Sequence, residues 1–426
     1  MRASFRQSSD RKDRIMSMKA IQGGVLAAKG FMAAAAAAGI KYKGRTDMAM
    51  IFSQKDCIAA GTFTSNVVKA APVLWDKQVV SSGKPVHVVI ANSGIANACT
   101  GQEGMDICQA SAEAVSEAFG GEIPAEGVLI CSTGVIGMQM PLDRVKDGIG
   151  QLVTGLADTE EAADQASHAI MTTDTKNKQF AVSFTVKGTE VHLGGMCKGS
   201  GMIHPNMCTM LSFLTTDCAI TKELLQKALS EDIKDTYNMV SVDGDTSTND
   251  TCLLLSNGAA GNAVIDAEDE DYQTFCQALH AVNEVLAKKM AEDGEGATHL
   301  FEVKVQGADN KAEAVLLAKS VVSSSLTKAA IYGRDANWGR VLAAMGYSGA
   351  QFDPMKVDLY FVNDIGKILV YKHGVPVDFD EDYAKEILSH PEVTALIEMN
   401  EGDAKATAWG CDLTHEYVNI NADYRS

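Results

Sequence analysis

Residues 196–217 read MCKGSGMIHPNMCTMLSFLTTD and join a glycine-rich loop to an apolar run at the midpoint of the 426-residue chain. Two glycines in this loop permit positive φ, and Pro205 keeps the residue before it out of the α region, so the backbone is expected to bend here. The run from Met210 to Leu214 is mostly apolar and predicts a buried strand. The stretch therefore predicts a bent loop that opens directly into the core, with Cys208 and Thr209 at the junction.

A threonine at such a junction fits a nucleophile whose own α-amino group acts as its base. That amine exists only if the chain is cut between Cys208 and Thr209. The residues alone also fit an ordinary glycine loop followed by a strand that begins with threonine, and loops of that kind are far more common than catalytic threonines. Both interpretations stay open on these residues.

Working outward, strands and helices alternate along the chain. A buried strand over 86–91, an amphipathic helix over 105–119 and a strand over 127–131 follow one another, which is typical of an α/β protein. Further hydrophobic patterns predict helices over 141–166, 269–292, 381–388 and 392–400, and a strand over 414–421 near the end of the chain.

The composition excludes several classes of partner. A net charge of −18 argues against nucleic acid and against an anionic membrane, because both attract a basic surface. The ten cysteines show no C-x-x-C spacing, which predicts buried reduced thiols, no zinc site and a cytoplasmic location. The longest apolar stretch, 30–40, is shorter than the roughly 20 residues that a membrane helix needs. The first 15 residues contain no apolar block, so no secretory signal is expected.

Three motifs together resemble the ornithine acetyltransferase (glutamate N-acetyltransferase) family of arginine biosynthesis: CSTGVIG at 131–137, KGSGMIHPNMCTML at 198–211 and DGEGATHL at 293–300. The resemblance extends from about residue 19 to the end through NSGIANACTG, MTTDT, SVDGDTSTND, GRDANWGR and YVNINADYRS. The chain departs from the family at Ile95, where Asn is frequent, at Cys208, where Ala is common, at Ala336, where Pro is usual, and at Ser426, where Thr commonly ends the chain. Of these departures, only Ser426 falls on a substrate-binding position.

The resemblance implies an α/β fold with a two-sheet, αββα-like sandwich of the kind found in N-terminal-nucleophile enzymes. It implies an N-terminal extension over 1–18, an α chain over 19–208 and a β chain over 209–426, both made from one precursor and assembled as a heterotetramer with two copies of each. The implied activity moves acetyl from N-acetylornithine to glutamate, two small-molecule substrates. No cofactor is expected, and acetyl-CoA is left open as an additional acetyl donor.

The resemblance also assigns roles to individual residues. Thr209 is the nucleophile, and Thr133 with Gly134 forms the oxyanion hole. The substrate-binding residues implied by the family are Thr172, Lys198, Thr209, Glu295, Asn421 and Ser426. Without the resemblance, the CSTG motif also fits a simple turn after a strand, and the glutamate of DGEG also fits a solvated loop carboxylate.

Residues 240–250, VSVDGDTSTND, crowd carboxyl and amide groups into a short loop. The regular spacing of a calcium loop with its trailing glutamate is missing, so no metal site is predicted here. The alternative is side-chain to backbone bonding that fixes a loop beside the site.

Two rival functions remain. A self-cleaving threonine aminopeptidase or amidase would share the nucleophile but pass the acyl group to water. A non-catalytic binding protein would use the same cleft and would stay as one intact chain of 45.2 kDa.

Overall fold

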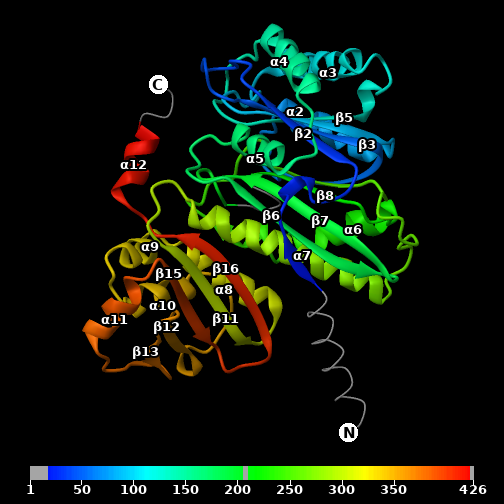
Figure 1. Ribbon diagram of the computed structural model, residues 1–426. Helices are drawn as coiled ribbons and strands as arrows, with labels where there is room; N and C mark the ends of the chain where they lie inside the picture. Colours follow the sequence, from blue (N-terminus) through cyan, green and yellow to red (C-terminus); the bar gives the residue numbers. More distant parts are fainter. Residues whose placement is uncertain (1–17, 205–209, 423–426) are drawn as a thin grey trace.

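The computed structural model describes residues 18–204 and 210–422, and their strands form two mixed sheets with helices on the faces (Figure 1). The order in the larger sheet is β1 (Lys19–Ile21), β6 (Lys178–Val186), β7 (Thr189–Lys198), β8 (Leu211–Thr216), β10 (Thr251–Ser256), β3 (Met48–Phe63), β4 (Val86–Asn92) and β5 (Val128–Ser132), with β2 (Phe31–Ala36) paired to β3. The order in the smaller sheet is β14 (Val375–Pro376), β13 (Lys367–Lys372), β12 (Asp358–Val362), β15 (Glu392–Glu398), β11 (Leu300–Ala308), β16 (Ala404–Cys411) and β9 (Val240–Ser241). The predicted α/β class with two helix-covered sheets is confirmed.

The helices that accompany the larger sheet are α2 (Ala71–Ser82), α3 (Gly101–Ala118), α4 (Leu142–Thr154), α5 (Glu160–Ala169), α6 (Lys222–Asp232) and α7 (Glu270–Glu292). Those that follow in the last third of the chain are α8 (Lys311–Ser323), α9 (Ser325–Tyr332), α10 (Trp338–Gly346), α11 (Glu381–Leu388) and α12 (His415–Ala422). Helix α7 packs on β6 and β7 of the larger sheet and on β11 and β16 of the smaller one, so a helix lies between the two sheets (Figure 1).

Strand β8 is the centre of the larger sheet. All six of its residues are buried, and it runs antiparallel to β7 on one side and parallel to β10 on the other. The registers place Lys198 opposite Leu211 and Leu211 opposite Thr251. The end of β7 and the beginnings of β8 and β10 therefore meet at one edge of the sheet.

Several predicted elements match the structure closely, among them the strand over 86–91 and the helices over 269–292 and 381–388. Asp269 caps the beginning of α7, because its carboxylate accepts hydrogen bonds from the N–H groups of Asp271 and Tyr272. The helix predicted over 141–166 is divided into α4 and α5. The division falls at Gly155–Thr159, where the Thr159 hydroxyl caps α5 by accepting a 3.2 Å bond from the Ala162 N–H.

Two predicted elements near the end of the chain are wrong in type. Residues 392–400, predicted as a helix, contain strand β15, whose residues alternate between buried and less buried as a strand requires. Residues 414–421, predicted as a strand, form helix α12 instead. The preceding strand β16 ends at Cys411, and no residue after it in the described part of the chain joins a sheet.

The described cysteines are unpaired thiols, and most of them are buried, as predicted; Cys99 is exposed and Cys276 is half-buried. Within residues 18–204 and 210–422, no single helix is long and apolar enough to cross a bilayer. Helices α8 and α9 reach that threshold only as a pair, across a 56° bend.

Asp76 is a fully buried carboxyl group on α2. It accepts a 2.7 Å hydrogen bond from the Ile130 N–H and a 3.3 Å bond from the Cys131 thiol, and so ties α2 to β5. Burial raises the pKa of Asp76 well above 3.8, since these two bonds only partly offset the loss of water. The folded protein therefore holds the proton of the Asp76 carboxyl group more tightly than the unfolded chain does.

This gives a prediction for the pH dependence of stability. As pH rises above 3.8 through the raised pKa, the free energy of unfolding should fall by at most about 1.4 kcal/mol per pH unit from this one group. Asp76→Asn keeps the size and the acceptor oxygen but removes the titration, so its stability should fall less over the same range. Chemical denaturation of both proteins between pH 4 and 8 measures the difference, and parallel curves would contradict the prediction.

Candidate active site

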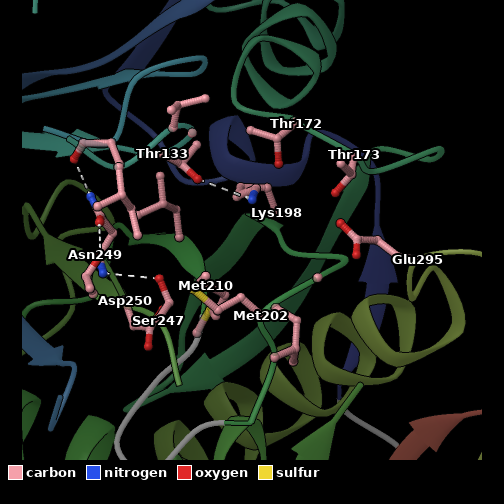
Figure 2. A pocket seen from close by; sticks show the side chains of 18 of the residues that line it. Thr133, Thr172, Thr173, Lys198, Met202, Met210, Ser247, Asn249, Asp250 and Glu295 are labelled. Atoms are coloured by element: carbon pink, nitrogen blue, oxygen red, sulfur yellow. Dashed lines mark hydrogen bonds between the residues drawn. The ribbon is translucent and has the colours of Figure 1, made fainter. Parts of the chain in front are cut away.

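A cavity of about 270 Å³ lies at the edge of the larger sheet where β5 and β7 end and β8 and β10 begin (Figure 2). The residues that line it come mainly from loops at the ends of these strands: Ala96, Thr133, Gly134, Val135, Ile136, Thr172, Thr173, Lys198, Gly201, Met202, Ile203, Met210, Leu211, Ser247, Thr248, Asn249, Asp250, Glu295 and Asn421. Of the predicted site residues, the cavity thus brings together Thr133, Gly134, Thr172, Lys198, Glu295 and Asn421.

Thr133 and Gly134 form the turn that follows β5. The Thr133 N–H donates a 3.0 Å bond to the Asn92 carbonyl, which holds the start of the turn. Gly134 has a φ of 133°, and a Cβ at this position would lie 2.2 Å from the Gly94 carbonyl carbon. Only glycine can occupy this position without moving the neighbouring loop, so the turn has one available shape.

Lys198, at the end of β7, points its ammonium at the Thr133 hydroxyl, with 3.4 Å between Nζ and Oγ1 (Figure 2). An ammonium can only donate, so the hydroxyl must accept this bond. The Thr133 proton is therefore free to be donated to a negatively charged oxygen in the cavity. A threonine polarised in this way is suited to an oxyanion hole.

A network of buried charges lies beneath Lys198. The Lys178 ammonium, with a side chain only 1% exposed, bridges Asp174 at 2.7 Å and Asp293 at 2.6 Å. Asp174 also lies 4.0 Å from the Lys198 ammonium and accepts a 2.7 Å bond from the Gly199 N–H. The network balances two carboxylates with two ammonium groups and fixes the loop that begins at Gly199.

The pKa values in this network follow from burial and charge. Burial alone would raise the pKa of Asp174, but attraction to Lys198 and Lys178 outweighs it and lowers that pKa to about 2. Burial lowers the pKa of Lys198 from its usual value of 10.5, in spite of the attraction to Asp174. In its charged form Lys198 is a desolvated ammonium, whose charge acts more strongly in the cavity than it would in water.

Glu295 lies on the loop between α7 and β11 with only 6% of its surface exposed, so it is not the solvated loop carboxylate of the alternative interpretation. Its N–H donates a 2.9 Å bond to the Ser200 carbonyl, and one of its carboxylate oxygens accepts a 2.7 Å bond from the Asn421 amide. A Cβ on Gly201 would lie 2.3 Å from this carboxylate. The glycine-rich loop at residues 199–203 and helix α12 thus contact Glu295 from two sides.

Thr172 and Thr173 line the wall between Lys198 and Glu295 (Figure 2). The Thr172 N–H donates a 3.1 Å bond to Asp174, so the same carboxylate that faces Lys198 also orients this threonine. Both hydroxyls are available to a polar ligand between the two charged side chains.

Three predicted residues, Cys208, Thr209 and Ser426, lie outside the described residues. On the two sides of 205–209, Ile203 and Met210 both line the cavity. Whether Thr209 is the nucleophile remains a prediction.

The loop over 240–250 is joined by side-chain to backbone hydrogen bonds to the glycine-rich loop at residues 199–203. Such bonding is the alternative to a metal site that the sequence predicted. The Asp243 carboxylate accepts bonds from the Met202 N–H at 2.6 Å and the Ile203 N–H at 2.9 Å, and a third from the Asp245 N–H at 3.2 Å. Among the described residues, no group of three His, Cys, Asp or Glu side chains is placed to hold a metal ion.

The sequence indicated a loop over 240–250 beside the site, but it did not indicate that Ser247, Thr248, Asn249 and Asp250 line the cavity. These residues lead into β10, and they reach the site because β10 pairs in parallel with β8. The motif STND was visible, but its distance from the site depends on a strand pairing that local sequence does not reveal.

Comparisons with known proteins identify relatives over nearly the whole chain. The ArgJ family model matches residues 32–426. The arginine biosynthesis bifunctional protein ArgJ 1 of Clostridium acetobutylicum is 50% identical over 396 residues, which cover 93% of this chain and 96% of that protein. The ArgJ protein of Thermotoga neapolitana is 50% identical over 399 residues, covering 93% and 99%. A solved chain of ornithine acetyltransferase from Mycobacterium tuberculosis, in complex with ornithine, is 43% identical, covers 44% of this chain and 98% of its own length, and gives a TM-score of 0.41.

Proposed function

The chain belongs to the ArgJ family, and from that premise we propose that it moves an acetyl group from N-acetylornithine to glutamate in arginine biosynthesis. The observation that carries this proposal is the convergence of Thr133, Gly134, Lys198, Glu295 and Asn421 around one cavity that Met210 also lines. Thr209 precedes Met210 in the chain, so we propose it as the nucleophile that carries the acetyl group.

The precursor would first cut itself. Thr209 Oγ attacks the Cys208 carbonyl carbon, and the peptide C–N bond breaks as an ester forms, which releases the Thr209 amine. Water then hydrolyses the ester, which frees the Thr209 hydroxyl and leaves a carboxylate on Cys208. The products would be residues 1–208 and 209–426. The freed amine has an ordinary pKa of about 7.7–8.0, which suits a base that works near neutral pH.

The order of the larger sheet supports the stability of such a cut protein. Strands β8 and β10, from the C-terminal piece, lie between β7 and β3, which belong to the N-terminal piece. The two pieces could separate only by breaking strand pairings on both sides of this insertion. We therefore propose an α chain of 19–208 and a β chain of 209–426 that remain associated. An assembly with two copies of each is proposed from the family resemblance alone.

In turnover, the Thr209 amine would take the proton from its own hydroxyl, and Oγ would attack the acetyl carbonyl of N-acetylornithine. Thr133 and the Gly134 N–H would donate to the oxygen that becomes negative. The ornithine amine leaves with a proton, and an acetyl ester remains on Thr209. The glutamate amine then attacks this ester and carries the acetyl group away, which restores the free threonine.

The charges of the cavity suit amino-acid substrates. The Lys198 ammonium can bind a carboxylate, with Asn421 and Ser426 proposed as its helpers, and the Glu295 carboxylate can bind the ammonium group of ornithine. Two opposite charges at separate points of one cavity fix both the position and the direction of a zwitterionic ligand.

Glu295→Gln tests this assignment. The change keeps the size of the side chain and removes its charge, so binding of the cationic end of ornithine should weaken by about 1.5–3 kcal/mol, the worth of a charged hydrogen bond. Glutamate has no cation at its side-chain end, so its use as acceptor should suffer less. Steady-state kinetics of both half-reactions would measure the difference.

Glu302→Gln is a matched control for this experiment. Glu302 is a similarly buried carboxylate that accepts a 2.8 Å hydrogen bond from the indole N–H of Trp409, but it does not line the cavity. The Glu302→Gln variant should therefore carry out both half-reactions at almost unchanged rates. Equal losses for ornithine and glutamate in Glu295→Gln would mean that Glu295 shapes the loop and does not bind the substrate ammonium.

The overall function is tested by incubating the purified protein with N-acetylornithine, with and without glutamate. The proposal expects N-acetylglutamate to form in step with ornithine release. Acetate formation that ignores glutamate would favour the rival threonine amidase. A parallel assay with acetyl-CoA as donor decides whether this protein also uses that substrate. A cytoplasmic location remains a prediction.

A further inference from the structure

Asn249 precedes β10, and its side chain, in a residue that is 7% exposed, is directed across the cavity wall toward the N-terminal half of the chain. Its amide nitrogen donates to the Ala96 carbonyl at 2.6 Å and to the Ser132 carbonyl at 2.8 Å. Its amide oxygen accepts a 2.7 Å bond from the Thr248 hydroxyl. Both protons of the amide are thus used on backbone carbonyls, and Thr248 fixes which way the amide faces.

The Ser132 carbonyl belongs to the peptide unit that leads into the turn of Thr133 and Gly134, which we call the oxyanion turn. At the other end of this planar unit, the Thr133 N–H donates to the Asn92 carbonyl at 3.0 Å. One peptide plane is therefore held at its oxygen by Asn249 and at its nitrogen by Asn92. This plane fixes the backbone from which the Thr133 side chain projects, and the Gly134 N–H lies in the next peptide unit along the same turn.

The segment that carries Asn249 also contacts the other side of the site. The Thr251 N–H donates a 2.8 Å bond to the carbonyl of Met210, the residue after Thr209 in the chain. The parallel register continues this contact by placing Thr251 opposite Leu211. Residues 249–251 therefore connect the oxyanion turn on one side with the beginning of β8 on the other.

We propose that Asn249 is a positioning residue that sets the orientation of the Thr133 and Gly134 donors toward the cavity. The inference rests on the proposed function, because it assigns Asn249 to the same transfer reaction. Asn249 itself touches no reacting atom in this scheme and acts through the Ser132–Thr133 peptide. A donor displaced by 1 Å can cost about 100-fold in rate, so the geometry that Asn249 sets is expected to matter for kcat.

The first test compares Asn249→Ala with Asn262→Ala. Asn262 is a close match, since it is 6% exposed and its amide donates to two backbone carbonyls, those of Ala219 at 3.1 Å and Ala263 at 2.9 Å. It does not line the cavity. Both variants should lose similar stability, whereas only Asn249→Ala should lower kcat, by about 10- to 100-fold with a much smaller change in KM.

A double-mutant cycle with Thr133→Ala identifies the route of the effect. If Asn249 acts through the oxyanion turn, Asn249→Ala should cost clearly less in a chain that already lacks the Thr133 hydroxyl. If the fold-loss in kcat of the double variant equals the product of the two single losses, the proposal is overturned. Equal kcat values for the Asn249 and Asn262 variants would also overturn it.

Thr248→Val covers the case in which Asn249→Ala does not fold. Valine keeps the shape of Thr248 but removes the hydroxyl that orients the Asn249 amide, so kcat should fall in the same direction by a smaller factor, and an unchanged kcat would then reject the proposal. A wild-type protein without acetyl transfer would instead reject the proposed function. The two failures are therefore distinguishable.

Discussion

Thr209→Ala is expected to yield one uncut chain of 45.2 kDa that transfers no acetyl group. Both the self-cleavage and the acetyl ester need the Thr209 hydroxyl, and the base for turnover is the amine that cleavage releases. No other residue can replace both functions, so the loss of activity should be complete within the sensitivity of the assay. Denaturing gels and intact mass measure the cleavage, and a coupled assay measures the transfer.

Cys208→Ala is the matched control at the same bond. The carbonyl that is attacked belongs to the backbone, and alanine is common in the family at this position, so this variant should still cleave and transfer acetyl. Two fragments from Thr209→Ala would remove Thr209 as the nucleophile. An uncut Cys208→Ala protein would show that the thiol takes part in the cleavage.

Thr133→Ala should have the next largest effect, a fall in kcat of about 100-fold or more with a smaller change in KM. The reason lies in the Lys198 bond: because the ammonium donates to Thr133, the hydroxyl proton can be donated to the developing oxyanion. Removal of one such donor costs roughly 3–4 kcal/mol in the transition state. Steady-state kinetics on the cleaved enzyme would measure both constants.

Two further variants separate this effect from a loss of structure. Thr133→Ser keeps a hydroxyl at the same position and should recover most of the rate. Thr236→Ala removes a buried hydroxyl that bonds the Asp232 carbonyl at 2.9 Å outside the cavity lining, and it should leave kcat unchanged. An unchanged kcat in Thr133→Ala would reduce Thr133 to a turn residue.

Local motifs indicated several residues that the structure places around one cavity, and their roles stay predictions. Thr133, Lys198 and Glu295 each lie in a short motif at the end of a strand or helix, and the structure places all three around one cavity. Their grouping could be predicted because the family resemblance supplied the long-range information that spacing along the chain lacks. The hydrogen bond between Glu295 and Asn421 joins two predicted substrate-binding residues that are far apart in the sequence.

The failures share one physical cause, which is dependence on long-range pairing. Residues 392–398 form β15 between its partners β11 and β12, whereas most of 414–421 lies in helix α12. Asn249 bonds the Ser132 carbonyl at the end of β5, and the two meet because β10, β3, β4 and β5 are neighbours in the larger sheet. Side-chain periodicity reports which residues are buried, but it does not report the strand or loop against which they pack.

The central claim is that Thr209 carries the acetyl group between the two substrates. Intact mass spectrometry of the purified protein, before and after brief incubation with N-acetylornithine and no acceptor, tests it most directly. The account predicts two fragments that divide between Cys208 and Thr209, with the mass of one acetyl group added to the C-terminal fragment and lost again when glutamate is added. An intact chain, or a C-terminal fragment that never gains the acetyl group while transfer proceeds, would contradict it.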